Sequence, residues 1–169
     1  MLFYERDGAL IAKRAAETLR VEAWGSDSLR VRATMLPEIQ DTCWALTEPV
    51  TGRAQVKIYA PGTWDGDPDL GQGLIACITN GRVSCAVNEV GVMSFYRDGK
   101  LFLREYFRSY GGTISRESRC LKVVNREWKG CIGGDQFSLN LKFESNNGEK
   151  LFGMGQYQQE YLDLKGTVL

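Results

Sequence analysis

Carboxylates are the side chains in this sequence whose chemistry is most readily named. Histidine is absent from all 169 residues, which removes the usual general base, the histidine of a catalytic triad and the commonest metal ligand. Paired carboxylates can cleave glycosidic bonds without histidine. The candidates, by residue type only, are Glu89, Glu105, Glu144, Glu149 and Asp163. Each is explained more simply as a solvated charge or a turn residue, so we predict no catalytic residue in this chain.

Tryptophans offer a second kind of chemistry, because their faces can stack on sugar rings. The four are Trp24, Trp44, Trp64 and Trp128. Trp64 is the best candidate, since it lies in a polar, glycine-rich loop. The alternative for each is packing against the core or edge of a sheet, where tryptophan supplies a large apolar area. We keep Trp64 as a candidate sugar contact.

Metal and cofactor motifs are weak or missing. Asp65, Asp67 and Asp69 alternate as in a calcium loop, but Leu70 stands where the glycine belongs and Ala76 where the bidentate glutamate belongs. We therefore read this segment as a solvated loop. No nucleotide-binding or nucleophile motif is present either, and we expect neither a metal nor a cofactor.

Cysteine spacing and charge narrow the class of protein. The five cysteines include no Cys-x-x-Cys pair, and their odd number does not fit a closed disulfide framework. Lys and Arg total 21 and Asp and Glu total 21, which disfavours a nucleic-acid partner. Charges interrupt the apolar start of the chain, so it does not read as a signal peptide. No apolar run approaches ~18 residues. We expect a cytoplasmic protein without membrane contact.

Turn signals organise the chain into hairpins. Asp7-Gly8, Asn80-Gly81 and Asp98-Gly99 each separate two short apolar runs, the strongest local signal for a two-residue hairpin turn. Placing the second turn at Asn80-Gly81 pairs Ile78 with Val83 and puts Cys77 and Cys85 on opposite faces. The third turn pairs Tyr96 with Leu101 and Phe95 with Phe102.

The remaining segments extend the same pattern. Residues 19–23 and 29–33 alternate apolar and polar positions, as half-buried antiparallel strands do. Residues 137–144 form a long alternating strand, whereas 128–134 read as a glycine-rich loop and 13–18 as one helical turn. Nine or ten short strands with little helix predict an all-β fold, an antiparallel β-sandwich in a single domain spanning 1–169.

One glycine-containing stretch stands out near the end of the chain. Gly153, Gly155 and Gln156 follow a short apolar run, and Gly166 closes a Leu-Lys-Gly segment. The spacing is not a dinucleotide fingerprint, which needs a third glycine and a following helix. A glycine bend where a strand leaves a packed sheet is favoured over a ligand-binding loop.

Four pieces in order resemble the N-terminal β-sandwich domain of family 31 glycoside hydrolases, which include α-glucosidases and α-xylosidases. They are the strand pair 17–25 with 28–32, then 78–83, then 91–96 with 98–106, and the stretch 149–166. The resemblance implies a galactose-mutarotase-like β-sandwich that precedes a catalytic (β/α)8 barrel. The family's Trp-x-Asp-x-Asn-Glu nucleophile block is absent here, so we expect this chain alone to be inactive.

The function implied is that of an accessory domain of a retaining α-glycosidase of carbohydrate metabolism. Such a domain packs on its own barrel and helps to wall the cleft for an oligosaccharide or α-glycoside. Gly153, Gly155, Gln156 and Gly166 would be structural members of the family motif. A sheet edge left unpaired would favour a homo-oligomer. The alternative is a free-standing carbohydrate-binding module that uses exposed aromatic side chains such as Trp64.

Overall fold

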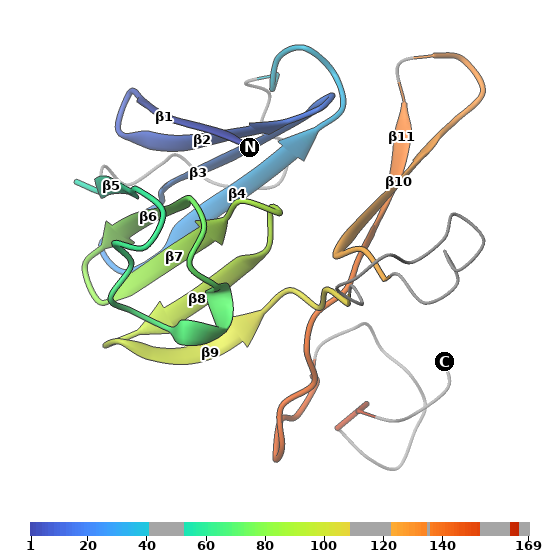
Figure 1. The fold of residues 1–169 in the computed structure, drawn as a ribbon. Coiled ribbons are helices and arrows are strands. Elements are labelled where there is room, and N and C mark those ends of the chain that lie inside the picture. The colour runs from blue at the N-terminus through green and yellow to red at the C-terminus, as the bar shows by residue number, and fades with distance from the viewer. Residues whose placement is uncertain (41–52, 109–122, 135, 153–162, 166–169) are drawn as a thin grey trace, which may run out of the picture.

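The computed structural model describes residues 1–40, 53–108, 123–134, 136–152 and 163–165. Nearly all regular structure in these ranges is antiparallel strand (Figure 1). The strands are β1 (Leu2–Arg6), β2 (Ala9–Arg14), β3 (Glu17–Ala23), β4 (Leu29–Thr34), β5 (Gln55–Tyr59), β6 (Ile75–Asn80), β7 (Val83–Asn88), β8 (Met93–Arg97), β9 (Lys100–Arg104), β10 (Arg126–Gly130) and β11 (Phe137–Leu141).

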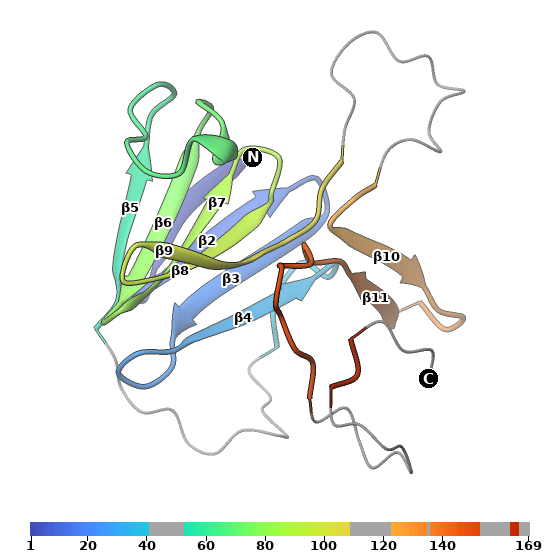
Figure 2. The ribbon, with the colours of Figure 1, turned by 90° about the horizontal axis from the view of Figure 1, so that it is seen from below.

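Two sheets pack face to face and form the main body of the molecule (Figure 2). One sheet has the order β1-β2-β3-β4 and the other the order β5-β6-β7-β8-β9, and every pairing is antiparallel. Their inner faces share one apolar core, to which Leu10, Leu19 and Val21 contribute from the first sheet and Ile78 and Val87 from the second. The predicted all-β antiparallel sandwich is therefore confirmed.

Two-residue turns connect the hairpins where the aspartate–glycine pairs predict them. Asp7 and Asp98 have φ of 53° and 50°, and the glycines that follow them have φ of 70° and 76°. Two successive residues with positive φ are typical of the type I′ turn, whose twist matches that of paired strands. The helical turn predicted over 13–18 is wrong, because Ala15 has φ of 50° in another tight turn that pairs Arg14 with Glu17.

The turn between β6 and β7 lies one residue later than predicted. Asn80 pairs with Val83, and Ile78 therefore pairs with Cys85. The buried Asn80 side chain donates to the carbonyl oxygens of Gly25, at 2.8 Å, and Ser28, at 2.7 Å. These bonds to the β3–β4 turn hold Asn80 within the strand. Cys77 and Cys85 still lie on opposite faces and are not disulfide-bonded, as predicted.

The β8–β9 hairpin contains a bulge that changes one predicted pairing. Tyr96 lies opposite Leu101 as predicted, but Phe95 lies opposite Leu103 and not opposite Phe102. The extra residue on β9 leaves Phe102 49% exposed, with its ring centroid 6.5 Å from that of Phe95.

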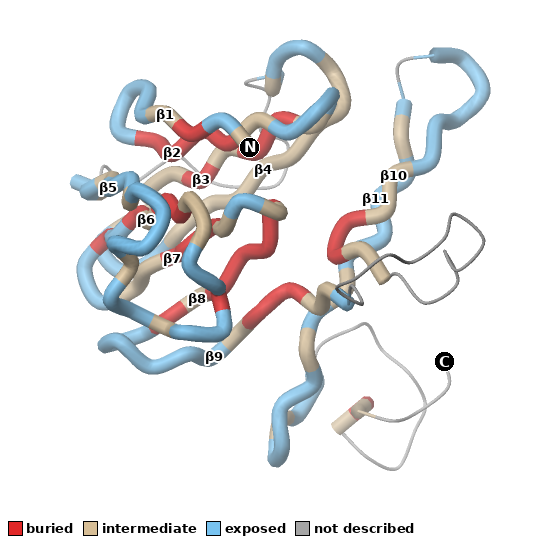
Figure 3. Tube along the Cα trace, in the orientation of Figure 1, coloured by how far each residue is buried: buried red, intermediate tan, exposed pale blue. Residues whose placement is uncertain are grey.

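A two-stranded arm, β10–β11, projects from the side of the sandwich in both ribbon views (Figures 1 and 2). Its first strand corrects the prediction of a loop over 128–134, since Arg126–Gly130 pairs along its length with Phe137–Leu141. Isolated bridges, Glu105 to Phe143 and Arg108 to Val123, connect the arm to the chain that leaves β9. Figure 3 shows that burial is concentrated in the sandwich and falls along the arm.

The loop between β5 and β6 adds a layer on the outer face of the five-stranded sheet. A short 3-10 helix, Pro68–Leu70, lies in this loop, and Asp67 caps it by accepting from the amide of Asp69. Leu70 and Trp64 pack with Ile75, Ala86 and Tyr96 in a second apolar cluster. No helix in the described ranges is long and apolar enough to cross a bilayer.

Candidate functional site

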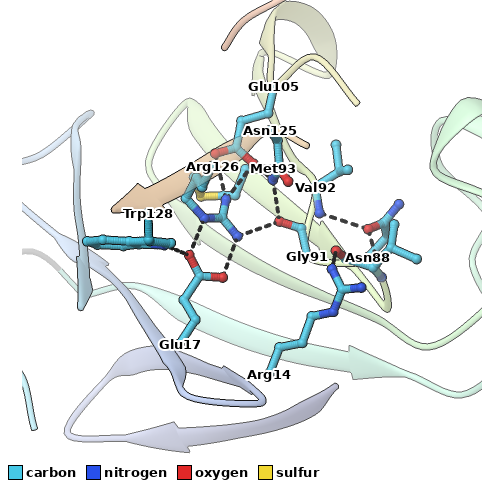
Figure 4. Close-up of polar contacts among 11 residues, drawn as sticks. Arg14, Glu17, Asn88, Gly91, Val92, Met93, Glu105, Asn125, Arg126 and Trp128 are labelled. Carbon is cyan, nitrogen blue, oxygen red and sulfur yellow. Dashed lines mark hydrogen bonds and ion pairs between the residues drawn. The ribbon is translucent and has the colours of Figure 1, made fainter. Parts of the chain in front are cut away.

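Glu105, one of the candidate carboxylates, is fully buried rather than solvated (Figure 4). Its Oε2 accepts from the amide of Met93 at 2.9 Å, from Asn125 Nδ2 at 2.6 Å and from Arg126 Nη1 at 2.6 Å. Its Oε1 accepts from Arg126 Nη1 at 2.6 Å. Because its oxygens are taken up by these donors, Glu105 is held in place as a structural acceptor.

Arg126 joins this carboxylate to a second one. The Arg126 side chain is 3% exposed and donates from Nε to Glu17 Oε1 at 2.6 Å. Its Nη2 donates to Glu17 Oε2 at 3.2 Å and to the Gly91 carbonyl at 2.8 Å. Trp128 Nε1 donates to the same Glu17 Oε1 at 2.9 Å. We call Glu17, Glu105, Asn125, Arg126 and Trp128 the clasp.

The clasp does not have the arrangement of a glycosidase acid–base pair. Its two carboxylates, Glu17 and Glu105, share one guanidinium instead of facing an open cleft. Burial raises the pKa of Glu17, but hydrogen bonds from Arg126 and Trp128 and the charges of Arg126 and Arg14 outweigh it, so the pKa lies below its ordinary value. A carboxyl that holds its proton so weakly is a poor general acid near neutrality.

The other candidate carboxylates lie apart from the clasp in exposed or turn positions. Glu149 accepts from the Asn146 amide at 2.8 Å and lies 3.4 Å from Lys165 Nζ. Asp163 accepts from the amides of Leu151 and Lys165, and these bonds hold its pKa below the ordinary value. Glu89 is exposed and Glu144 half-buried. Of the five candidate carboxylates, only Glu105 belongs to the clasp. The second carboxylate of the clasp, Glu17, was not predicted.

The aspartate-rich loop is exposed over most of its length, as predicted, and cation and hydroxyl contacts hold Asp67 and Asp69. Asp67 Oδ2 accepts from the Tyr96 hydroxyl at 2.9 Å and pairs with Arg104 Nη2. Asp69 lies 3.2 Å from Arg104 Nη1. Burial, the bond to Asp67 and its charge together raise the pKa of Tyr96. Within the described residues, no group of three or more acidic, cysteine or histidine side chains could hold a metal ion.

Trp64 anchors this loop on the sheet. Its ring meets Tyr59 edge-on, with centroids 4.9 Å apart, and covers the space that a side chain at Gly66 would need. Its Nε1 donates to the Asp67 carbonyl at 2.9 Å. A shallow pocket of about 150 Å³ adjoins it, lined also by Cys77, Ser84 and Tyr96. The half-buried ring thus leaves part of its surface beside a small open space.

The remaining aromatic candidates have internal partners or lie outside the described residues. Arg30 stacks over the Trp24 ring at 4.6 Å, and Trp128 belongs to the clasp. Trp44 lies outside the described ranges. So do the motif residues Gly153, Gly155, Gln156 and Gly166.

Sequence reasoning missed the two arginines that organise these clusters. Neither Arg104 nor Arg126 belongs to a sequence motif for catalysis or ligand binding. The partners of Arg126 lie 109 and 21 residues away, at Glu17 and Glu105. The available signal was an arginine at an inward strand position, where an unpaired charge is rarely tolerated.

Comparisons with known proteins place the chain among larger enzymes. No protein-family model matches it. It is 38% identical over 162 residues to an uncharacterized family 31 glucosidase of Pseudescherichia vulneris, covering 90% of this chain and 28% of that protein. It is also similar to the crystal structure of a GH31 alpha-xylosidase from a soil metagenome complexed with xylose. That match has a TM-score of 0.76 and 35% identity, and it covers 98% of this chain and 24% of the other.

The chain thus spans about a quarter of the length of the relatives it matches. The match to a solved structure over nearly all of the chain agrees with the order of its sequence motifs and with its β-sandwich. Over most of its length the chain is therefore similar to a part of two proteins named as family 31 enzymes, as its motifs predict.

Proposed function

We propose that residues 1–169 form the N-terminal accessory domain of a retaining α-glycoside hydrolase that acts on an α-glucoside or α-xyloside. The observation that carries this proposal is the match over nearly all of this chain to about a quarter of two family 31 proteins. In this proposal the catalytic carboxylates lie on a barrel elsewhere in the full-length polypeptide. The domain packs on that barrel and helps to wall the substrate cleft.

The described carboxylates support a role without chemistry of its own. Glu17 and Glu105 bind the same guanidinium, and Asp67 and Asp69 bind that of Arg104. Each of these acids holds a neighbouring segment in place. We also place the protein in the cytoplasm, which suits the unpaired cysteines Cys77, Cys85 and Cys131.

The test compares the 169-residue chain with the longest polypeptide that its gene encodes. Both are assayed with aryl α-glucosides and aryl α-xylosides. The longer polypeptide should turn over at least one of them, and the chain alone should turn over none. Turnover by the chain alone, or an inactive longer polypeptide that is folded, would refute the proposal.

A second candidate function is sugar binding by the domain itself, and the pocket beside Trp64 favours it. Calorimetric titration with malto- and xylo-oligosaccharides tests this. Binding that Trp64→Phe preserves and Trp64→Leu removes would support a stacking contact. Both variants must first keep the unfolding transition of the original chain, because Trp64 also anchors its loop.

A further inference from the structure

The two-stranded arm has one apolar face and one polar face. The strand register puts Trp128 opposite Leu139, and Arg126 opposite Leu141. Side chains of directly opposed residues share a face. That face carries the apolar side chains of Trp128, Phe137, Leu139 and Leu141, with the clasp residue Arg126 at one end. The other face carries Glu127, Lys129, Ser138 and Asn140, and Lys142 Nζ reaches Glu127 at 3.2 Å beside it.

The apolar face is covered at its β10 side and open along β11. Trp128 bonds to Glu17 of the sandwich, and its ring meets Phe137 edge-on at 6.3 Å. Further along, Leu139 is 37% exposed and Leu141 is 44% exposed, and Phe143 just beyond the strand is 43% exposed. Amphipathic strands usually bury their apolar side, so this stretch lacks a covering layer among the described residues.

Exposed large apolar side chains are concentrated in the last part of the described chain. Of ten exposed large apolar side chains among the described residues, six follow residue 130. They are Ile132, Leu139, Leu141, Phe143, Leu151 and Phe152. The sandwich sheets, by contrast, bury most of their large apolar side chains. An exposed apolar cluster on an otherwise well-packed protein marks a contact surface.

The clasp shows that the orientation of this face matters. All three nitrogens of the Arg126 guanidinium donate hydrogen bonds, and these hold β10 against Glu17, Gly91 and Glu105. Burying charge in this way is costly unless every group is bonded. A hairpin with no packing role beyond itself would not need to be fixed so firmly.

We propose that Leu139, Leu141 and Phe143 form the surface by which this domain packs on the rest of a longer polypeptide. This rests on the proposed function, because the relatives are about four times as long as the match.

The exposed area of this surface suits a partner segment in the same chain. Three side chains, each about four-tenths exposed, offer on the order of 200–300 Å². A stable dimer needs ~800 Å² from each partner. A segment tethered in the same chain needs far less, since its effective concentration is high.

The test uses two matched pairs of substitutions on the same strand. Leu139→Lys with Leu141→Gln changes the apolar face, and Ser138→Lys with Asn140→Gln adds the same charge to the polar face. Each pair is made in the 169-residue chain and in the longest polypeptide that the gene encodes. Thermal and urea unfolding are measured for each variant. In the longer polypeptide, the rate at which a protease separates this domain from the rest is measured as well.

We expect the apolar-face pair to speed that separation at least about tenfold in the longer polypeptide, while leaving unfolding of the 169-residue chain nearly unchanged. The polar-face pair should change neither. Equal effects of the two pairs would overturn the proposal, as would a gene that encodes nothing after residue 169. So would a 169-residue dimer that the apolar-face pair converts to a monomer.

These outcomes are independent of catalysis. A longer polypeptide without glycosidase activity in which the apolar-face pair still speeds separation would refute the proposed function and leave the docking surface standing. An active enzyme in which the two pairs of substitutions have equal effects would support the proposed function and refute the docking surface.

Discussion

At the scale of single residues, Arg126 connects parts of the chain that are far apart in sequence. Its guanidinium lies between Glu17 at the start of β3 and Glu105 just after β9. Glu105 is fully buried, and Arg126 supplies the cation that pairs with this carboxylate away from water.

Arg126→Met should therefore lower the free energy of unfolding by about 3–5 kcal/mol, because it leaves a buried carboxylate without its cation. Urea unfolding measures the change. Glu127→Gln is the matched control, since it removes a half-exposed ion pair with Lys142 from the next position on β10. Such a pair contributes about 0–1 kcal/mol. Similar losses for the two variants would contradict the role given to the clasp.

Glu17 makes part of this stability depend on pH. Its pKa lies below the ordinary value of 4.5 in the folded chain, despite burial, because Arg126 and Trp128 bond its ionised form. The contribution is then fully present above the unfolded-state pKa and is lost as pH falls through the folded-state value. The free energy of unfolding should drop as the pH falls below the ordinary value of 4.5, and less steeply in Glu17→Gln. Parallel pH profiles for the two proteins would count against this assignment.

Thiol reactivity should separate the three described cysteines. Burial raises the pKa of Cys85 strongly and that of Cys77 more moderately, and the thiolate is the reactive form. Cys131 is exposed in the turn of the arm. Brief alkylation of the native chain with peptide mapping should label Cys131 first and Cys85 only after unfolding. Early labelling of Cys85 would mean that the sandwich opens locally.

At the scale of elements, two hairpin glycines with similar backbone angles should respond differently to substitution. Gly81 and Gly99 have φ of 58° and 76°. A side chain at Gly99 would meet nothing within 4 Å, whereas one at Gly81 would overlap Asp27 and the backbone of Ser26.

Gly99→Ala should therefore cost only the backbone penalty of about 1–2 kcal/mol. Gly81→Ala should cost more, because the contact between the β6–β7 and β3–β4 turns must also open. Thermal unfolding of the two variants measures the difference. Equal costs would mean that the contact between the turns contributes little.

The same hairpins show how far the sequence could predict the elements. The Asp-Gly turns were predictable because both residues must adopt positive φ, a local requirement that the sequence displays. The position of the β6–β7 turn was not, since Asn80 is held by carbonyls 55 and 52 residues earlier. Strand β10 was not predicted because Trp128 is the one apolar side chain on its inward face, and its pairing with β11 is not visible in its own sequence.

The candidate site was less predictable than the fold. Residue type marked Glu105 and Trp64, but their roles depend on packing that brings distant segments together. Glu105 was expected in solvent and is buried in the clasp. The loop of Trp64 is largely exposed, as expected, but Trp64 and Leu70 also pack on the sheet. Local patterns carry turn and strand information, whereas ion pairs across 109 residues leave no local pattern.

At the scale of the whole molecule, the arm and the sandwich depend on each other. Removing residues 126–169 would take away no member of the shared apolar core, yet it would remove the only cation that contacts Glu105 among the described residues. We expect the polypeptide 1–125 to unfold at lower urea concentration than the full 169 residues. Glu105→Gln in the shortened chain should recover part of the loss, because it removes the uncompensated charge.

The second apolar cluster on the outside of the five-stranded sheet has a consequence for sequence variation. Neighbouring residues of its central strands point in opposite directions, yet both are buried, as with Ile75 and Ala76, Cys85 and Ala86, and Met93 and Ser94. In a library of random substitutions, these strands should reject polar replacements at consecutive positions. Strand β2 of the other sheet, where Ala9 to Ala12 are all buried, should reject them too. Strand β4, where no residue is fully buried, should accept them widely, so strands of one sheet would diverge at different rates.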